Sequence, residues 1–253
     1  MTIDLAGRHA LVTGASRGIG RAVAEAYAAA GADVALLARD VARLEETRKA
    51  VEAHGRRAVV LVADVTDADA VRLAVETAIE QLGHLDIVVN NAGGNSFSAP
   101  FVDVRAAGWH KTLALNLDST VSVCQAVGPH LLERRSGAVV NVASVAGLAA
   151  VPAMSHYGAA KAAVLSLTRT LAVEWAPAGV RVNALVPGWV ATDLTEFARR
   201  GDESIGRRLL ARVPMGRWAT VEEMTGPAVF LASDAASFMT GQMLVVDGGL
   251  TVA

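Results

Sequence analysis

The chain has 253 residues and a mass of 26.1 kDa, a size that fits one large domain or two small ones. Its 53% hydrophobic and 19% charged residues exclude a disordered chain, and a net charge of −2 offers no basic surface for a nucleic-acid partner. No apolar run reaches the roughly 18 residues that span a bilayer, so no membrane partner is expected.

Seven short apolar runs predict strands, and helical stretches separate them. A regular alternation of strands and helices is typical of a parallel sheet covered by helices on both faces. No repeat, low-complexity segment or linker interrupts the pattern, so we expect one α/β domain over residues 1–253, with a doubly wound, seven-stranded parallel sheet. The predicted strands are His9–Thr13, Val34–Leu37, Ala58–Val62, Ile87–Asn90, Ala138–Val142, Val180–Val186 and Met243–Val246.

A glycine-rich turn, Gly14-Ala-Ser-Arg-Gly-Ile-Gly20, joins the first predicted strand to an alanine-rich helical stretch. A strand, a glycine turn and a helix start in that order form the context in which dinucleotides bind. We expect Gly14 to permit the tight turn, Gly18 to let the backbone approach the pyrophosphate, and Gly20 to let helix and strand pack closely. The glycine spacing departs from the usual Gly-x-Gly-x2-Gly, and a structural turn without a ligand is the alternative.

Residues 189–212 follow Pro187-Gly188 at the end of the sixth predicted strand and have mixed polarity. In an open parallel sheet, ligands bind beyond the carboxyl ends of the strands. We therefore predict that this segment is a lid over the substrate and the nicotinamide. A plain helical hairpin on the surface is the alternative.

Tyr157 and Lys161 lie four residues apart in a predicted helix, and Tyr157 comes thirteen residues after Ser144. Residues at i and i+4 share one helix face, so the phenol and the ammonium are expected to point the same way. A cation roughly 4 Å away lowers the pKa of a tyrosine, ordinarily near 10, by up to about three units. The pair therefore predicts a phenol that exchanges protons near neutral pH, and an ordinary exposed pair is the alternative.

Five ordered motifs together resemble the short-chain dehydrogenases/reductases of the classical type. They are Thr13-Gly14-x3-Gly18-x-Gly20, Asn90-Asn-Ala-Gly93, Asn116, Ser144 and Tyr157-x3-Lys161. The resemblance continues through Pro187-Gly188 to Gly241-Gln-Met-Leu-Val-Val-Asp-Gly-Gly249 and covers essentially the whole chain. It implies a single NAD(P)-binding Rossmann domain and an enzyme that interconverts a carbonyl compound and a secondary alcohol by hydride transfer.

The resemblance also implies roles for single residues. Tyr157 is the implied general acid/base, Ser144 holds and polarises the substrate oxygen, and Lys161 also binds the nicotinamide ribose. Asn116 is implied to bend its helix and to hold the water chain that feeds protons to Lys161. Taken alone, Ser144 also fits a turn or cap, and Asp64 fits a cap before the following helix. The implied cofactor contacts, besides Tyr157 and Lys161, are Gly14, Ser16, Arg17, Gly18, Ile19, Gly20, Arg39, Asp64, Val65, Asn90, Ala92, Gly93, Pro187, Gly188, Val190 and Thr192.

The end of the second predicted strand distinguishes two cofactors. NAD-specific sites place a carboxylate there to hold the ribose 2′-hydroxyl, whereas a 2′-phosphate requires a cation. Ala38 occupies the position of the family's carboxylate, Arg39 follows it, and Arg17 is placed to reach the same phosphate from the other side. We therefore expect NADP(H), with NAD(H) as the alternative because Asp40 lies close by. A solvated Arg39 without a role is the other interpretation.

The substrate pocket is expected to have mixed polarity and much apolar surface. One alternative substrate class is the 3-oxoacyl group of a carrier protein or of CoA, because Arg135 matches an arginine that docks the acidic carrier in a similar branch. Ala178, where that branch commonly has a basic residue, argues against it. A nucleotide-sensing regulator is the non-enzymatic alternative, which the intact Ser-Tyr-Lys set opposes. The candidate pocket residues are Ser96, Phe97, Met154, His156, Trp189, Leu194 and Phe197.

The segment Ser155–Trp175 carries apolar side chains on more than one face, and the segment Gly241–Ala253 ends in an apolar tail. A second apolar stripe predicts a partner, so we expect a homotetramer or a homodimer, with a monomer as the alternative. The single Cys124 excludes an internal disulfide and, without a basic-then-apolar leader, favours the cytoplasm. The six histidines lack metal-ligand spacing, so no metal is expected.

Overall fold

Seven strands form one parallel sheet in the order β3-β2-β1-β4-β5-β6-β7. The computed structural model describes residues 3–196, 199 and 203–253. The predicted doubly wound parallel sheet is confirmed, and each strand begins and ends within one residue of the predicted position. The strands are β1 (His9–Thr13), β2 (Asp33–Ala38), β3 (Ala58–Val62), β4 (Ile87–Asn90), β5 (Gly137–Val142), β6 (Val180–Pro187) and β7 (Met243–Val246).

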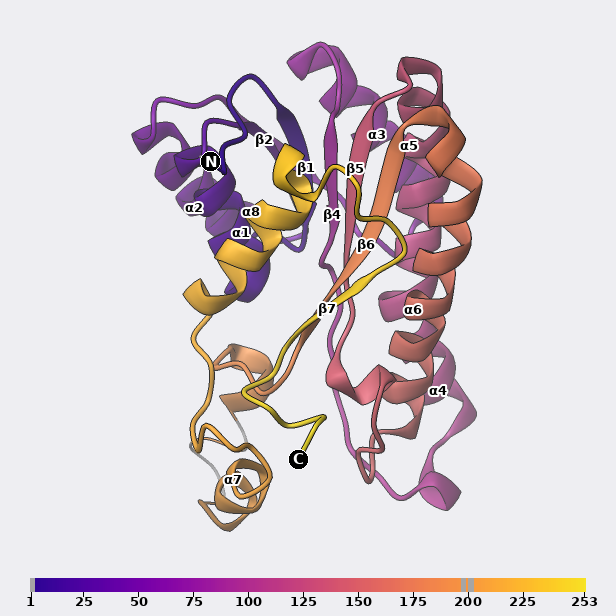
Figure 1. The fold of residues 1–253 in the computed structure, drawn as a ribbon. Coiled ribbons are helices and arrows are strands. Elements are labelled where there is room, and N and C mark those ends of the chain that lie inside the picture. The colour runs from indigo at the N-terminus through magenta and orange to yellow at the C-terminus, as the bar shows by residue number, and fades with distance from the viewer. Residues whose placement is uncertain (1–2, 197–198, 200–202) are drawn as a thin grey trace.

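Helices cover both faces of this sheet (Figure 1). The first face carries α1 (Gly18–Ala29), α2 (Val41–Ala53) and α8 (Thr225–Ala232). The second carries α3 (Ala68–Leu82), α4 (Ala106–Leu113), α5 (Ser119–Arg134) and α6 (Ser155–Trp175). Among the described residues, no helix has both the length and the apolar character needed to cross a bilayer.

Burial on both faces explains why the strands are rich in apolar residues. All residues of β2 and of β4 are buried. Leu11 of β1 lies between Ala35 of β2 and Val88 of β4, and these three side chains face the core under α3 and α5. The next residue, Val12, belongs to the core under α1 and α8. Each fully buried aliphatic side chain contributes about 1.5–3 kcal/mol, so the central strands anchor both layers.

The direction of winding reverses between β1 and β4, which are neighbours in the sheet. Connections on the two sides of such a switch point diverge and leave a crevice at the carboxyl ends of the strands. Gly14 follows β1, Asn91 follows β4 and Ser144 comes after β5, all at this edge. The fold therefore gathers the predicted cofactor and catalytic motifs at one end of the sheet.

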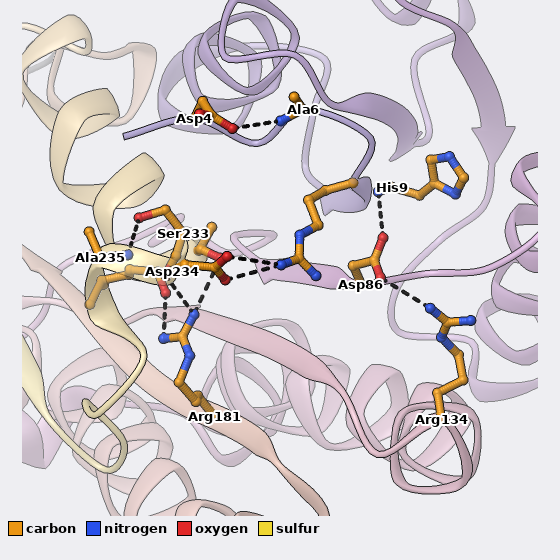
Figure 2. Close-up of polar contacts among 12 residues, drawn as sticks. Asp4, Ala6, His9, Asp86, Arg134, Arg181, Ser233, Asp234 and Ala235 are labelled. Atoms are coloured by element: carbon orange, nitrogen blue, oxygen red, sulfur yellow. Dashed lines mark hydrogen bonds and ion pairs between the residues drawn. The ribbon is translucent and has the colours of Figure 1, made fainter. Parts of the chain in front are cut away.

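Ion pairs and backbone contacts close the opposite, amino-terminal edge of the sheet (Figure 2). Arg8 binds Asp234 with nitrogen–oxygen distances of 3.0 and 3.3 Å, and Arg181 donates to three backbone oxygens just before Asp234. Asp86 accepts a hydrogen bond from Arg134 at 3.2 Å. A cavity of about 450 Å³ lies among these residues, but the length of β5 (roughly 20 Å) separates it from Ser144.

The predicted lid, residues 189–212, leaves the carboxyl end of β6. Val190 forms an isolated parallel bridge with Ala219, which ties the beginning of the segment to the chain that follows it. In the described part of this segment, Asp193–Thr195 forms a 3-10 turn and α7 (Glu203–Leu210) is an α-helix. The closing role of the segment stays a prediction, and Phe197 lies outside the described residues.

Candidate active site

Ser144 and Tyr157 meet where the chain leaves β5 and enters α6. The Ser144 Oγ accepts a hydrogen bond from the backbone N–H of Ala146 at 3.2 Å, which stabilises the turn after the strand. Tyr157 lies in the first turn of α6, where it is buried, and the Ser144 hydroxyl acts to lower the pKa of its phenol. Ser144 therefore caps the turn and also lies beside the phenol, so the two interpretations of this serine are compatible.

Lys161 lies one helical turn beyond Tyr157, with its ammonium 5.7 Å from the centroid of the phenol ring. Its Nζ donates to the backbone oxygen of Val142 at 2.9 Å, and both side chains are buried, which rules out an ordinary exposed pair. Burial raises the pKa of Tyr157 to about 12, against the opposing effect of the Ser144 hydroxyl. Burial also lowers the pKa of Lys161 to about 8.

The expectation that the phenol of Tyr157 exchanges protons near neutral pH is therefore wrong for the chain by itself, because its pKa is raised. Desolvation disfavours the charged form of each group, and for Tyr157 it is the largest influence. The spacing correctly places the two groups on one helix face, but spacing does not reveal how deeply they are buried.

Asn116 lies in a π-helical turn, Ala114–Asp118, between α4 and α5. Its Oδ1 accepts from the backbone N–H of Gly94 at 2.9 Å, and its Nδ2 donates to the Gly94 oxygen at 2.8 Å. A Cβ added to Gly93 would lie 2.7 Å from Asn116 Oδ1 and 3.2 Å from Lys161 Nζ. A π-helical turn therefore interrupts the α-helix at Asn116 and these residues adjoin, whereas the bend and the water chain remain predictions.

The glycine loop has the geometry that a dinucleotide pyrophosphate requires. Gly14 and Gly18 adopt left-handed backbone conformations, with φ of +65° and +57°. A Cβ on Gly20 would collide with Asn91 Nδ2 and with the Gly14 oxygen, so α1 approaches β1 only because this residue lacks a side chain. Among the described residues, no side chain caps the amino end of α1, which leaves N–H donors for phosphate. The other predicted contacts in this loop are half-buried: Ser16 and Ile19.

Thr13 and Asn91 connect the glycine loop to the loop after β4, and neither was predicted as a site residue. The Thr13 Oγ1 accepts from the backbone N–H groups of Asn91 and Ala92, both at 3.0 Å. Asn91 Nδ2 donates to the Thr13 oxygen at 2.9 Å. Asn90 instead turns its amide inward, with Nδ2 2.8 Å from Asn141 Oδ1, so only its backbone borders the crevice. Both unpredicted residues stand inside the motifs, where the glycines are the more visible signal.

Arg39 lies beyond the end of β2 with a largely exposed side chain, and its Nη1 is 3.3 Å from Asp64 Oδ2. Asp64 also accepts from the backbone N–H two residues further on, so it caps this turn, and Val65 beside it is buried. Asp40, the reason for keeping NAD(H) as an alternative, is the N-cap of α2 and accepts a backbone N–H at 3.1 Å. The carboxylate of Asp40 is thus engaged by its own helix.

The segment after β6 lies over the glycine loop. Thr192 Cγ2 is 3.6 Å from the position of a Cβ added to Gly18, and the next residue, Asp193, binds Arg17 at 2.9 Å. Because Asp193 is its partner here, the contact of Arg17 with the phosphate expected at Arg39 stays a prediction. The remaining residues predicted on the nicotinamide side lie in the same stretch: Pro187, Gly188 and Val190.

The predicted substrate-facing residues lie in different surroundings. The His156 ring stacks on Phe97, with centroids 4.1 Å apart, and its Nε2 lies 2.8 Å from Asn95 Oδ1. Trp189 instead makes an edge-to-face contact with Trp218 at 5.9 Å. The others stand at the surface or partly buried: Ser96, Leu194 and Met154.

A glycine loop at a switch point, beside the gathered side chains of Ser144, Tyr157 and Lys161, defines the class of protein as a dinucleotide-dependent oxidoreductase. The family described as enoyl-(acyl carrier protein) reductase matches residues 14–251. The chain belongs to the short-chain dehydrogenase/reductase family.

Three similar proteins cover almost the whole chain. Gluconate 5-dehydrogenase of Gluconobacter oxydans is 42% identical, over 99% of this chain and 97% of the relative. The 3-oxoacyl-[acyl-carrier-protein] reductase of Thermotoga maritima is 37% identical, over 98% of this chain and 99% of the relative. A gluconate 5-dehydrogenase from Burkholderia cenocepacia, solved in complex with NADP and tartrate, is 38% identical with a TM-score of 0.95, over 99% of this chain and 98% of that one.

Proposed function

We propose that this chain is an NADP(H)-dependent oxidoreductase that interconverts a carbonyl compound and a secondary alcohol, with Tyr157 as general acid/base. The gathering of Ser144, Tyr157 and Lys161 at the switch-point edge is the observation that supports this proposal most strongly. The dinucleotide, when bound, gives or accepts the hydride.

The protein's own contribution is to place and transfer the proton. During reduction, the Ser144 hydroxyl donates to the substrate oxygen, and Tyr157 gives up its proton as that oxygen gains negative charge. A phenol with a pKa of about 12 holds this proton at neutral pH and therefore suits the role of an acid. During oxidation a phenolate must form, and the nearby Lys161 cation, with a pKa of about 8, favours that charge.

Three features at the end of β2 support a preference for NADP(H) over NAD(H). Ala38 offers no carboxylate to a ribose hydroxyl, and Asp40 is engaged as a helix cap. Arg39 has an exposed guanidinium beside Asp64, where it can bind a 2′-phosphate as a forked donor. NADP in the similar gluconate 5-dehydrogenase from Burkholderia cenocepacia is consistent with this preference.

The relatives' names favour a small polyhydroxylated compound as the first substrate class to test, and Arg135 argues against an acyl carrier. Arg135 follows the last residue of α5, and its guanidinium donates to the backbone oxygen of Pro177 at 2.7 Å. Ser144 follows the far end of β5, a strand that spans roughly 20 Å. Within one chain, Arg135 therefore lies at the amino-terminal edge of the sheet, opposite the edge that holds Ser144 and not at the mouth of the candidate site.

We also infer a homotetramer, or at least a homodimer. Val173 on α6 has 77% of its surface exposed, and Val252 in the C-terminal tail has 88%. These apolar side chains fit a second covered face, which a two-fold partner would provide. We further propose a cytoplasmic location. Cys124 is a free, buried thiol, and burial raises its pKa to about 12, which suits a reducing compartment.

A panel of polyols, sugar acids, simple ketones and 3-oxoacyl thioesters tests the function directly. Turnover with NADP(H) is followed as the absorbance of the reduced nicotinamide, with NAD(H) in parallel. We expect turnover of at least one carbonyl–alcohol pair, lost in Tyr157→Phe. Turnover that persists in Tyr157→Phe would contradict the proposed chemistry, and a preference for carrier thioesters would restore the alternative.

A further inference from the structure

Hydrogen bonds at both ends hold the loop after β4 in place, and we call residues 93–99 the β4 loop. At its beginning, Gly94 exchanges two backbone hydrogen bonds with the Asn116 side chain. At its end, the backbone N–H of Ala99 donates to the Ala153 oxygen at 3.0 Å. Between these ends, the side chain of His156 on α6 makes two further contacts with the loop.

His156 binds the β4 loop through its ring edge and through its ring face. Its Nε2 lies 2.8 Å from Asn95 Oδ1, and its face is parallel to the Phe97 ring within 3° at 4.1 Å. Burial lowers the pKa of this fully buried imidazole, against the opposing backbone of Phe97, so the ring is neutral at neutral pH. Because an amide oxygen only accepts, Nε2 carries the proton and donates to Asn95.

The inward side chains of the β4 loop are the ones that His156 holds. Asn95 and Phe97 are partly buried, whereas Ser96 and Ser98 are exposed. Phe97 is confined further by α4, because a Cβ added to Gly108 would lie 3.0 Å from Phe97 Cζ. The imidazole thus holds Asn95 and Phe97 on the inner side of the loop and leaves Ser96 and Ser98 on the exposed side.

The β4 loop also borders the catalytic side chains. Gly93 adjoins Asn116 and Lys161, and a Cβ added to Gly94 would lie 3.8 Å from Leu194 Cδ1 in the segment after β6. His156 itself immediately precedes Tyr157 on α6. The loop therefore lies between the candidate catalytic groups and the predicted lid.

We propose that His156 is a positioning residue that holds the β4 loop as a preformed wall of the substrate pocket. It sets the affinity for substrate and takes no part in proton transfer. This inference rests on the proposed oxidoreductase function, because the wall matters only where a substrate binds beside Tyr157. If the loop samples other conformations, the apparent affinity for substrate equals the intrinsic affinity multiplied by the fraction of time that the loop is correctly placed.

The test uses Asn95→Ala, which removes the acceptor without altering α6, together with two variants of the histidine. His156→Phe keeps the ring stack and loses the donor, whereas His156→Gln keeps a donor and loses the stack. We expect Asn95→Ala and His156→Phe to raise the KM for substrate about five- to tenfold, the range of one lost hydrogen bond. The kcat should stay within about threefold and the NADPH affinity within about twofold, and His156→Gln should recover part of the KM.

The double variant, Asn95→Ala with His156→Phe, should raise KM no more than either single change, because the two residues share one contact. The exposed His110 in α4 gives a matched control, and His110→Gln should leave KM unchanged. An unchanged KM in Asn95→Ala, or multiplied effects in the double variant, would overturn the proposal. Equal losses of kcat and NADPH affinity would also overturn it, since they indicate a damaged scaffold.

A second measurement needs no substrate. Amide hydrogen exchange of the NADPH complex should be faster at residues 94–99 in Asn95→Ala than in the wild type or in His110→Gln. Unchanged exchange would refute the positioning role even if no substrate had been found. Faster exchange together with a wild-type enzyme that turns over nothing on the panel would instead count against the proposed function.

Discussion

The ammonium of Lys161 lies 5.7 Å from the ring centroid of Tyr157, on the same face of α6. At this distance, within the protein, burial affects the two side chains more strongly than they affect each other. The phenol is held protonated, with a pKa of about 12, and the lysine loses its proton more easily than in water, with a pKa of about 8. The chain thus presents a protonated acid beside a cation that is retained at neutral pH.

Replacing Tyr157 with phenylalanine should remove the proton donor and leave the fold intact. We expect kcat to fall by about 10²–10⁴-fold, the usual contribution of general acid–base catalysis, while dinucleotide affinity changes only a few-fold. Steady-state kinetics with a cofactor titration measures both quantities. More than about a tenth of wild-type activity in the variant would rule out the assigned role.

Lys161 should make the free energy of unfolding depend on pH above pH 8. Its pKa is about 8 in the folded chain and 10.5 ordinarily, so between these values the unfolded state binds more protons and stability rises with pH. From pH 8 to pH 10 we expect the wild type to gain up to roughly 2–3 kcal/mol relative to Lys161→Met. Urea unfolding of the wild type and of Lys161→Met, both without cofactor, measures this difference in unfolding free energy at each pH. The contributions of the other titratable groups are the same in both proteins and cancel. Parallel pH profiles for the two proteins would contradict the lowered pKa.

Arg39→Ala should weaken the preference for NADP(H). A charge-assisted contact with the 2′-phosphate is worth about 1.5–3 kcal/mol, so the difference in affinity between NADP(H) and NAD(H) should narrow by that amount. Arg48→Ala gives a control, because this α2 arginine pairs with Glu45 and Glu52 on its own helix. Equal affinity for both dinucleotides in the wild type, or a difference unchanged by Arg39→Ala, would contradict the assignment.

Gly20→Ala should destabilise the cofactor site, because the new Cβ meets Asn91 and the Gly14 backbone. We expect a loss of at least about 2 kcal/mol in unfolding free energy, together with loss of dinucleotide binding. Gly226→Ala in α8 is the matched comparison, since nothing lies within 4 Å of its added Cβ. It should be neutral or stabilising by up to about 1 kcal/mol. Similar unfolding midpoints for the two variants would contradict the close approach of α1 to β1.

The assembly can be tested by light scattering at micromolar concentration. We expect a mass that is four times, or at least twice, the 26.1 kDa of one chain. Placing a charge on the exposed apolar face with Val173→Glu should lower this mass if α6 contributes to the contact. A mass of 26.1 kDa for the wild type would refute the assembly.

Local pattern was enough for the strands and for the glycine turn. The run His9–Thr13 has an apolar centre, Ala10–Val12, because β1 is covered on both faces, and the predicted bounds match the structure. Gly14 and Gly18 could be recognised because a left-handed backbone favours the residue without a Cβ. The spacing of Tyr157 and Lys161 likewise follows from helix geometry, which depends only on neighbours along the chain.

The amino-acid sequence by itself determined the order of strands and helices, the glycine loop and the residue types of the candidate catalytic set. Only the tertiary structure decided that Arg17 binds Asp193, 176 residues away, and that His156 binds Asn95, 61 residues away. The tertiary structure also decided that the pKa of Tyr157 is raised rather than lowered, because desolvation depends on which distant side chains cover the phenol. Periodicity and spacing record covalent neighbours, whereas ion pairs, orientation and burial arise when remote segments pack together.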